Sequence, residues 1–126
     1  MSLFYIISFG IIGILARYYI SVLFSTIAGG TFPLGTFGIN ILGSFLIGVV
    51  YVLAAEKAQI SPQLRLGLMV GLLGGFTTFS AYSLETLRLI EESRYFHAAV
   101  YWMLSPVLGL GAAFCGALLV RKTMGS

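Results

Sequence analysis

Four runs of predominantly apolar residues account for most of this chain and limit what it can fold into. The runs cover approximately residues 3–24, 35–55, 63–89 and 96–120. Each can cross a bilayer core of about 30 Å, which needs about 20 apolar residues in a helix. Hydrophobic residues make up 59% of the chain and charged residues 9%, whereas a soluble domain carries about 25% charge. The sequence therefore predicts an all-α membrane protein with four transmembrane helices in a single transmembrane domain, residues 1–126.

The segments between the runs are short and predict no soluble domain. A turn is expected at residues 28–33, and Ser61-Pro62 is typical of a helix start with proline in the first turn. An even number of spans places both termini on the same side. No basic residue precedes the first run, so that run does not resemble a signal peptide and is expected to stay in the mature protein. The net charge of +3, without a basic stripe interleaved with aromatic residues, argues against a nucleic-acid partner.

Orientation in a membrane normally follows an excess of Lys and Arg on the cytoplasmic side, and this chain has almost no such excess. Four basic residues lie on the side of the termini and three on the other: Lys57, Arg65, Arg121 and Lys122 against Arg17, Arg88 and Arg94. Either the chain inserts in both orientations and pairs with its own inverted copy, or a partner or another detail sets its orientation. Small residues favour close helix approach in a dimer, although some of them pack the monomer, among them Gly13, Gly38, Gly48, Gly111 and Gly116.

The third run contains the most informative stretch, Gly74-Gly75-Phe76-Thr77-Thr78. Adjacent glycines followed by two threonines weaken a helix, and backbone carbonyls freed at membrane depth commonly coordinate cations. Phe79 and Tyr82 follow on one helical face. Their ring edges carry partial positive charge and could partner an anion, or the rings could simply pack. Glu85 is either solvated near the interface or part of a polar path.

Polar residues inside the other runs are costly in lipid and are therefore candidate functional groups. Arg17 either snorkels to the headgroups or attracts anions to the mouth of a pathway. Asn40 either donates to a small dehydrated anion or ties two helices together. Tyr101 and Ser105 share one face of the fourth run, where Ser105 can donate back to the Tyr101 carbonyl and Pro106 frees other carbonyls. They either line a pore or pack between helices.

Taken together, these segments resemble the CrcB/Fluc family of fluoride channels over nearly the whole chain. The resemblance rests on specific stretches: Gly13-Ile14-Leu15-Ala16-Arg17-Tyr18, Gly35-Thr36 with Asn40 and Gly43, the stretch from Gly71 to Glu85, and Ser105 with Gly109. The run Gly74-Gly75-Phe76-Thr77-Thr78-Phe79-Ser80 is the most specific of them.

The resemblance implies a fluoride-selective channel, built as an antiparallel, dual-topology homodimer in the bacterial inner membrane, that exports cytoplasmic fluoride passively. It implies that the third helix is broken within the membrane, where the backbone carbonyls of Gly74 and Thr77 from both subunits hold a structural Na⁺. Asn40 would donate to fluoride and Phe79 would present its ring edge to it. The rest of the implied pathway consists of Tyr82, Ser80, Glu85, Tyr101 and Ser105, with Arg17 near the entry vestibule.

The chain departs from the family pattern at several positions, which makes the polar track sparser. Tyr82 replaces the second phenylalanine of a pair and adds a hydroxyl that must find a partner, and Ala81 replaces a usual threonine. Gly109 and Ala113 stand where some members have polar residues.

Two rival classes of protein fit less well. A small dual-topology multidrug or cation exporter needs a carboxylate deep in the first run, but every acidic residue lies near a run end: Glu56, Glu85, Glu91 and Glu92. A non-transporting scaffold subunit would explain the glycines but not the weakened third helix with Asn40. The sequence shows no catalytic group, so an enzyme is not expected.

Overall fold

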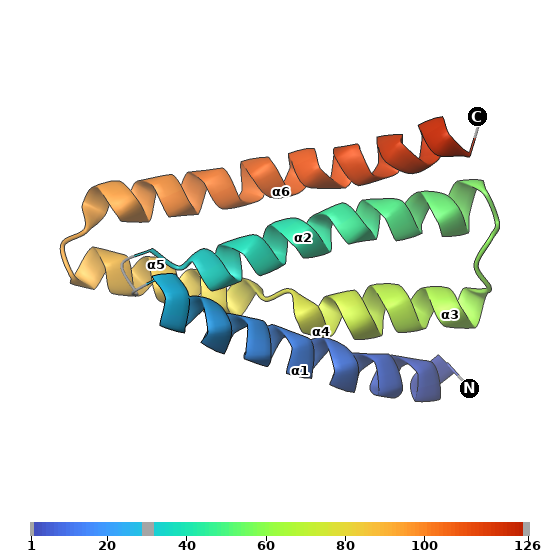
Figure 1. Cartoon of the computed structure of the whole chain (residues 1–126), viewed down its shortest axis with the longest axis horizontal. Helices are drawn as coiled ribbons and strands as arrows, with labels where there is room; N and C mark the ends of the chain where they lie inside the picture. The colour runs from blue at the N-terminus through green and yellow to red at the C-terminus, as the bar shows by residue number, and fades with distance from the viewer. Residues whose placement is uncertain (1, 29–31, 125–126) are drawn as a thin grey trace.

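The computed structural model describes residues 2–28 and 32–124, and nearly all of them are helical (Figure 1). The first helix is α1 (Ser2–Ala28). The second is α2 (Leu34–Tyr51), which continues as a π-helical stretch, η1 (Val52–Glu56). Residues 29–31, in the middle of the turn predicted at 28–33, lie outside the described residues, as do residues 1, 125 and 126 of the predicted domain.

The third helical segment is built from several pieces. These are α3 (Pro62–Leu66), the π-helical stretch η2 (Gly67–Leu73), α4 (Gly74–Phe76) and, after two extended residues, α5 (Phe79–Glu91). The last helix is α6 (Tyr95–Thr123). The hydroxyl of Ser61 accepts a hydrogen bond from the Leu64 amide at 3.2 Å, with Pro62 in the first turn. This confirms the helix start predicted at Ser61-Pro62.

Four helices of the described chain are long and apolar enough to cross a membrane: Ser2–Phe24, Leu34–Glu56, Pro62–Glu91 and Tyr95–Thr123. This confirms the prediction of a multi-pass, all-α membrane protein with four spans. The four run side by side, and the start of α1 lies at the same end of the bundle as the end of α6 (Figure 1). At that end Arg121 Nε donates to Glu56 Oε1 at 3.0 Å, which ties η1 to α6.

Most large apolar side chains point outward, and few are buried. Leu3 is 72% exposed and Val107 63% exposed. Such a surface is unfavourable in water but suits lipid, in which the apolar outside needs no cover. Most of the buried apolar side chains form two clusters, one between α5 and α6 and one between η1 and α6: Tyr82, Leu89, Ala98 and Tyr101, and Val52, Ala117 and Val120.

Glycines bring the helix backbones into direct contact within the chain. A Cβ added at Gly13 of α1 would lie 2.1 Å from the carbonyl oxygen of Leu72, and one added at Gly48 of α2 would lie 2.1 Å from that of Ala113 in α6. Such distances are too short for any side chain. Around Gly38 and Gly111, by contrast, no atom lies within 4 Å of the added Cβ. The close approach predicted from the small residues therefore includes contacts that pack the monomer.

Candidate functional site

The helical hydrogen-bond pattern stops at Thr77 and Thr78, near the middle of the Pro62–Glu91 segment. Thr77 has φ −87° and ψ 160°, and Thr78 has φ −152° and ψ 124°, so both are extended. Helix resumes at Phe79. Backbone groups that lose helical partners away from water must be satisfied by other groups. The residues around this interruption supply those partners.

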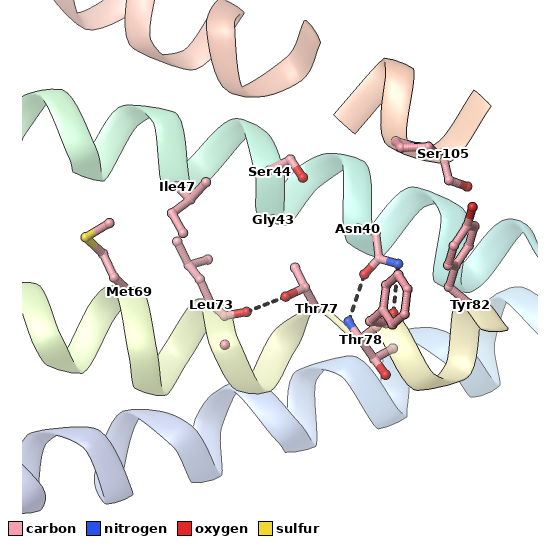
Figure 2. A pocket seen from close by; sticks show the side chains of 13 residues that line it. Asn40, Gly43, Ser44, Ile47, Met69, Leu73, Thr77, Thr78, Tyr82 and Ser105 are labelled. Carbon is pink, nitrogen blue, oxygen red and sulfur yellow. Dashed lines mark hydrogen bonds between the residues drawn. The ribbon is translucent and has the colours of Figure 1, made fainter. Parts of the chain in front are cut away.

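The side-chain amide of Asn40 pairs with both backbone groups of Thr78. The Thr78 N–H donates to Asn40 Oδ1 at 2.9 Å, and Asn40 Nδ2 donates to the Thr78 carbonyl at 3.1 Å (Figure 2). In a continuous helix the Thr78 N–H would instead donate to the carbonyl of Gly74. Asn40 thus ties α2 to the interruption, which was one of its two sequence interpretations. An amide nitrogen carries two N–H groups, and Thr78 takes one of them.

The two threonine hydroxyls stabilise the helix ends on either side. Thr78 Oγ1 accepts from the Ala81 N–H at 3.2 Å and so caps the start of α5. Thr77 Oγ1 donates to the Leu73 carbonyl at 2.9 Å, beside the bond from the Thr77 N–H to the same oxygen (Figure 2). A Cβ at Gly43 would lie 2.2 Å from Thr77 Cγ2, so α2 needs a glycine there.

Arg17 reaches the interruption from α1. Its Nε donates to the carbonyl oxygen of Gly75 at 3.0 Å, and its side chain is partly buried. In a continuous helix this carbonyl would accept from the Phe79 N–H, but Phe79 begins a new helix. The two sequence interpretations, snorkelling and attraction of anions, did not include this contact.

Glu85 accepts hydrogen bonds from two neighbouring helices. Thr36 of α2 donates to Oε2 at 2.8 Å, and the Tyr101 hydroxyl of α6 donates to Oε1 at 2.9 Å. Tyr101 is fully buried and Thr36 is 5% exposed, so this polar cluster is set inside the bundle. Sequence reasoning named Glu85 and Tyr101 but missed Thr36, although it lies in the quoted pair Gly35-Thr36.

Tyr82 uses its hydroxyl to satisfy a backbone group of α6. The hydroxyl donates to the carbonyl oxygen of Trp102. Four residues further on stands Pro106, inside α6 and without an N–H, so the Trp102 carbonyl has no helical donor. The hydroxyl that distinguishes Tyr82 from phenylalanine thus has its partner. Sequence reasoning missed Trp102, although its position four residues before the proline was a usable signal.

Ser105 does not form the hydrogen bond to the Tyr101 carbonyl that its place in the sequence would allow. Its Oγ is buried and has no hydrogen-bond partner in the described part of the chain. The physical reason is its orientation, because Ser105 lines a cavity instead of lying against its own helix (Figure 2).

This cavity of about 320 Å³ lies beside the interruption and brings several predicted residues together. They come from α2, α4, α5, α6 and the segment between α4 and α5: Asn40, Gly74, Thr77, Phe79, Tyr82 and Ser105. The side chain of Phe79 is 78% exposed. The other predicted residues, Arg17, Ser80, Glu85 and Tyr101, do not line the cavity, although Ser80 Oγ lies 3.2 Å from Thr78 Oγ1 in a hydrogen bond.

Four lipid-compatible helices, with polar side chains gathered around one interruption, define a multi-pass membrane protein with an internal polar site. Comparison with known proteins shows to which family of membrane proteins the chain belongs. Residues 4–117 match the family described as "CrcB-like protein, Camphor Resistance (CrcB)". The chain belongs to the CrcB family.

Relatives match over nearly their whole length. A protein of Geotalea daltonii is 43% identical over 113 residues, which cover 90% of this chain and 91% of the relative. One of Geotalea uraniireducens is 41% identical over 117 residues, covering 93% and 94%. One of Geobacter sulfurreducens is 40% identical over 114 residues, covering 90% and 92%. Each of the three is named "Fluoride-specific ion channel FluC".

Proposed function

We propose that this chain is a subunit of a fluoride-selective channel that exports cytoplasmic fluoride passively across the bacterial inner membrane. The observation that supports this proposal most directly is a cavity lined by Asn40 and by Ser105, whose hydroxyl is buried and has no hydrogen-bond partner among the described residues. These are neutral donors of the kind that can replace the hydration shell of a small anion. The names of the relatives favour a channel over an enzyme and do not favour the alternative of a multidrug exporter.

The groups that can donate hydrogen bonds to fluoride are those that the intramolecular hydrogen bonds leave available. Thr78 uses one N–H of Asn40 Nδ2, and the other donates to fluoride. The Ser105 hydroxyl is a second donor, and Phe79 and Tyr82 offer ring edges at the same cavity. Ser80, Glu85 and Tyr101 continue the polar track, and the positive charge of Arg17 beside the interruption raises the local anion concentration there.

A structural Na⁺ fits the carbonyl oxygens of Gly74 and Thr77. Their helical donors would be the N–H groups of Thr78 and Ala81, and both of these donate to side chains instead, to Asn40 and to Thr78 Oγ1. Gly74 and Thr77 also line the cavity. Hard cations prefer such oxygen ligands. When bound, the ion would neutralise the carbonyl dipoles that the interruption leaves unpaired, and so would stabilise it at membrane depth.

An antiparallel homodimer completes this arrangement. Two carbonyls from one subunit are too few for a hard cation, which takes about six oxygen ligands, so a second copy and water must supply the others. The exposed ring of Phe79 and the exposed Gly74 beside it offer a surface for that copy. Near-balanced flanking charge fits insertion in both orientations.

Efflux from liposomes tests the channel. Purified protein is reconstituted in vesicles loaded with K⁺ fluoride or K⁺ chloride, and efflux is followed after a K⁺ ionophore is added. We expect rapid fluoride loss with little chloride loss. Asn40→Asp and Phe79→Ile should each suppress fluoride loss, whereas Phe114→Ile, a matched change at a 60% exposed ring of α6, should not. Equal loss of both anions, or of neither, would contradict the proposal.

Cross-linking tests the inverted dimer separately. Cys115 is first replaced by serine, because it is an exposed free thiol. Single cysteines are then introduced at the end of α6 in one tagged copy and at the α5–α6 connection in another. Cross-links between these opposite ends support the antiparallel arrangement, and cross-links only between equivalent ends contradict it.

A further inference from the structure

The carbonyl groups of residues 73–75, where η2 continues into α4, interact with different partners. Leu73 O accepts from the Thr77 N–H and hydroxyl. Gly75 O accepts from Arg17 Nε at 3.0 Å. Gly74 O has lost its helical donor, because the Thr78 N–H donates to Asn40. The oxygen that Arg17 takes is therefore next in sequence to an oxygen proposed as a Na⁺ ligand.

The contact between Arg17 and Gly75 depends on unusually close packing of α1. Gly10, Gly13 and Arg17 lie on one face of α1, at helical spacings of three and four residues. A Cβ at Gly13 would lie 3.1 Å from the Phe76 nitrogen, and a Cβ at Gly75 would lie 3.0 Å from the carbonyl oxygen of Gly10. The backbones of α1 and α4 are therefore in contact one turn before Arg17. This contact fixes the position from which the Arg17 side chain reaches Gly75.

The charge of Arg17 suits this position. The last carbonyls of a helix carry a partial negative charge, which a cation stabilises. Two ion pairs, Arg94 with Glu92 and Arg121 with Glu56, lie at helix ends. At the interruption, the Gly75 carbonyl accepts a hydrogen bond from the Arg17 guanidinium.

We propose that Arg17 is a positioning residue for the Na⁺ site, because its bond to the Gly75 carbonyl fixes the three-residue helix α4 and thereby orients the Gly74 and Thr77 carbonyls. This rests on the proposed function, in which these two carbonyls bind the ion. Groups that orient metal ligands from outside typically change metal affinity about 10–100-fold when they are removed. The Arg17 guanidinium would be such a group, because it would orient the ligand carbonyls through the backbone without binding the ion.

Thermal unfolding in detergent measures this role without any transport assay. The unfolding midpoint is recorded while Na⁺ replaces N-methyl-D-glucamine at constant ionic strength. An ion that binds only the folded protein raises the midpoint, and the Na⁺ dependence gives a half-saturating concentration. We expect wild type to show this shift. Arg17→Gln should raise the half-saturating Na⁺ concentration about tenfold or more. Arg17→Lys, which keeps a charged donor, should raise it by less.

Arg65→Gln is the matched control, because Arg65 is exposed at the start of the same helical segment and loses the same charge. Its Na⁺ dependence should equal that of wild type. A purely electrostatic role for Arg17 predicts the reverse sign, since removing a like charge tightens Na⁺ binding; a lower half-saturating Na⁺ in Arg17→Gln therefore overturns the inference. If Arg17→Gln does not fold, an unchanged half-saturating value in Arg17→Lys overturns it.

The two proposals fail in different ways. A wild-type protein whose midpoint does not respond to Na⁺ contradicts the Na⁺ site itself, and the inference falls with it. A wild-type protein that responds, together with an Arg17→Gln variant of equal half-saturation, contradicts the positioning role alone.

Discussion

The hydroxyl of Tyr82 donates to the carbonyl of Trp102, the oxygen that Pro106 deprives of its helical donor. The Tyr82 hydroxyl therefore donates the hydrogen bond that the nitrogen of Pro106, which carries no hydrogen, cannot donate. Tyr82 and Pro106 are coupled chemically, although they lie on different helices.

The first prediction tests this coupling with a double-mutant cycle. Tyr82→Phe leaves the Trp102 carbonyl without a donor and should cost about 1–2 kcal/mol of stability. In a Pro106→Ala background the alanine amide supplies a helical donor, so Tyr82→Phe should cost much less. Thermal unfolding of the four proteins in detergent gives the coupling energy. Equal costs in both backgrounds would show that the hydroxyl does not replace the missing amide.

The second prediction concerns the clamp between Asn40 and Thr78. Asn40→Ala removes the partner of both the Thr78 N–H and the Thr78 carbonyl, at a cost of about 2–4 kcal/mol. Ser44→Ala is the control, one turn further along α2 and lining the same cavity, and should change stability by less than about 0.5 kcal/mol. Thermal unfolding midpoints of the two variants in detergent measure this difference in stability. Similar midpoints would mean that water replaces the amide without loss.

The third prediction separates transport from stability at Ser105. Its buried hydroxyl has no partner among the described residues, so Ser105→Ala should leave stability unchanged or raise it by about 1 kcal/mol. Fluoride efflux should nevertheless fall, because the cavity loses a donor. Ser83→Ala, an exposed serine on α5, should change neither property. A Ser105→Ala protein with wild-type efflux would remove Ser105 from the pathway.

The fourth prediction compares two glycines. At Gly48 an added Cβ would lie 2.1 Å from the Ala113 carbonyl, so Gly48→Ala should push α2 and α6 apart and cost about 1–3 kcal/mol. At Gly111 nothing lies within 4 Å of the added Cβ, and alanine should be neutral or stabilise by about 0.5–1 kcal/mol through helix propensity. Thermal unfolding measures both. A loss at Gly111 comparable to that at Gly48 would mean that Gly111 packs against a second copy.

The amino-acid sequence alone determined the membrane, the four spans and where helices start. These features are local: about 20 apolar residues in a row exclude water, and Ser61-Pro62 begins a helix through its own hydroxyl and ring. The weak helix expected around Gly74-Gly75 precedes the two extended residues, Thr77 and Thr78, because glycine and threonine are poor helix formers. The family pattern likewise lies in the order of residues and needs no coordinates.

Only the tertiary structure determined which polar groups form hydrogen bonds with each other. Arg17 and Gly75 are 58 residues apart, and Asn40 and Thr78 are 38 apart. Sequence reasoning identified carbonyls that lack donors and side chains that could donate, but several pairings were equally possible. Glycine contacts such as that of Gly13 with Leu72 fix how far and in which register two helices approach. That register places Arg17 against the Gly75 carbonyl and Asn40 against the Thr78 backbone. It also leaves the Ser105 hydroxyl at the cavity without a hydrogen-bond partner in the part of the chain that the structure describes.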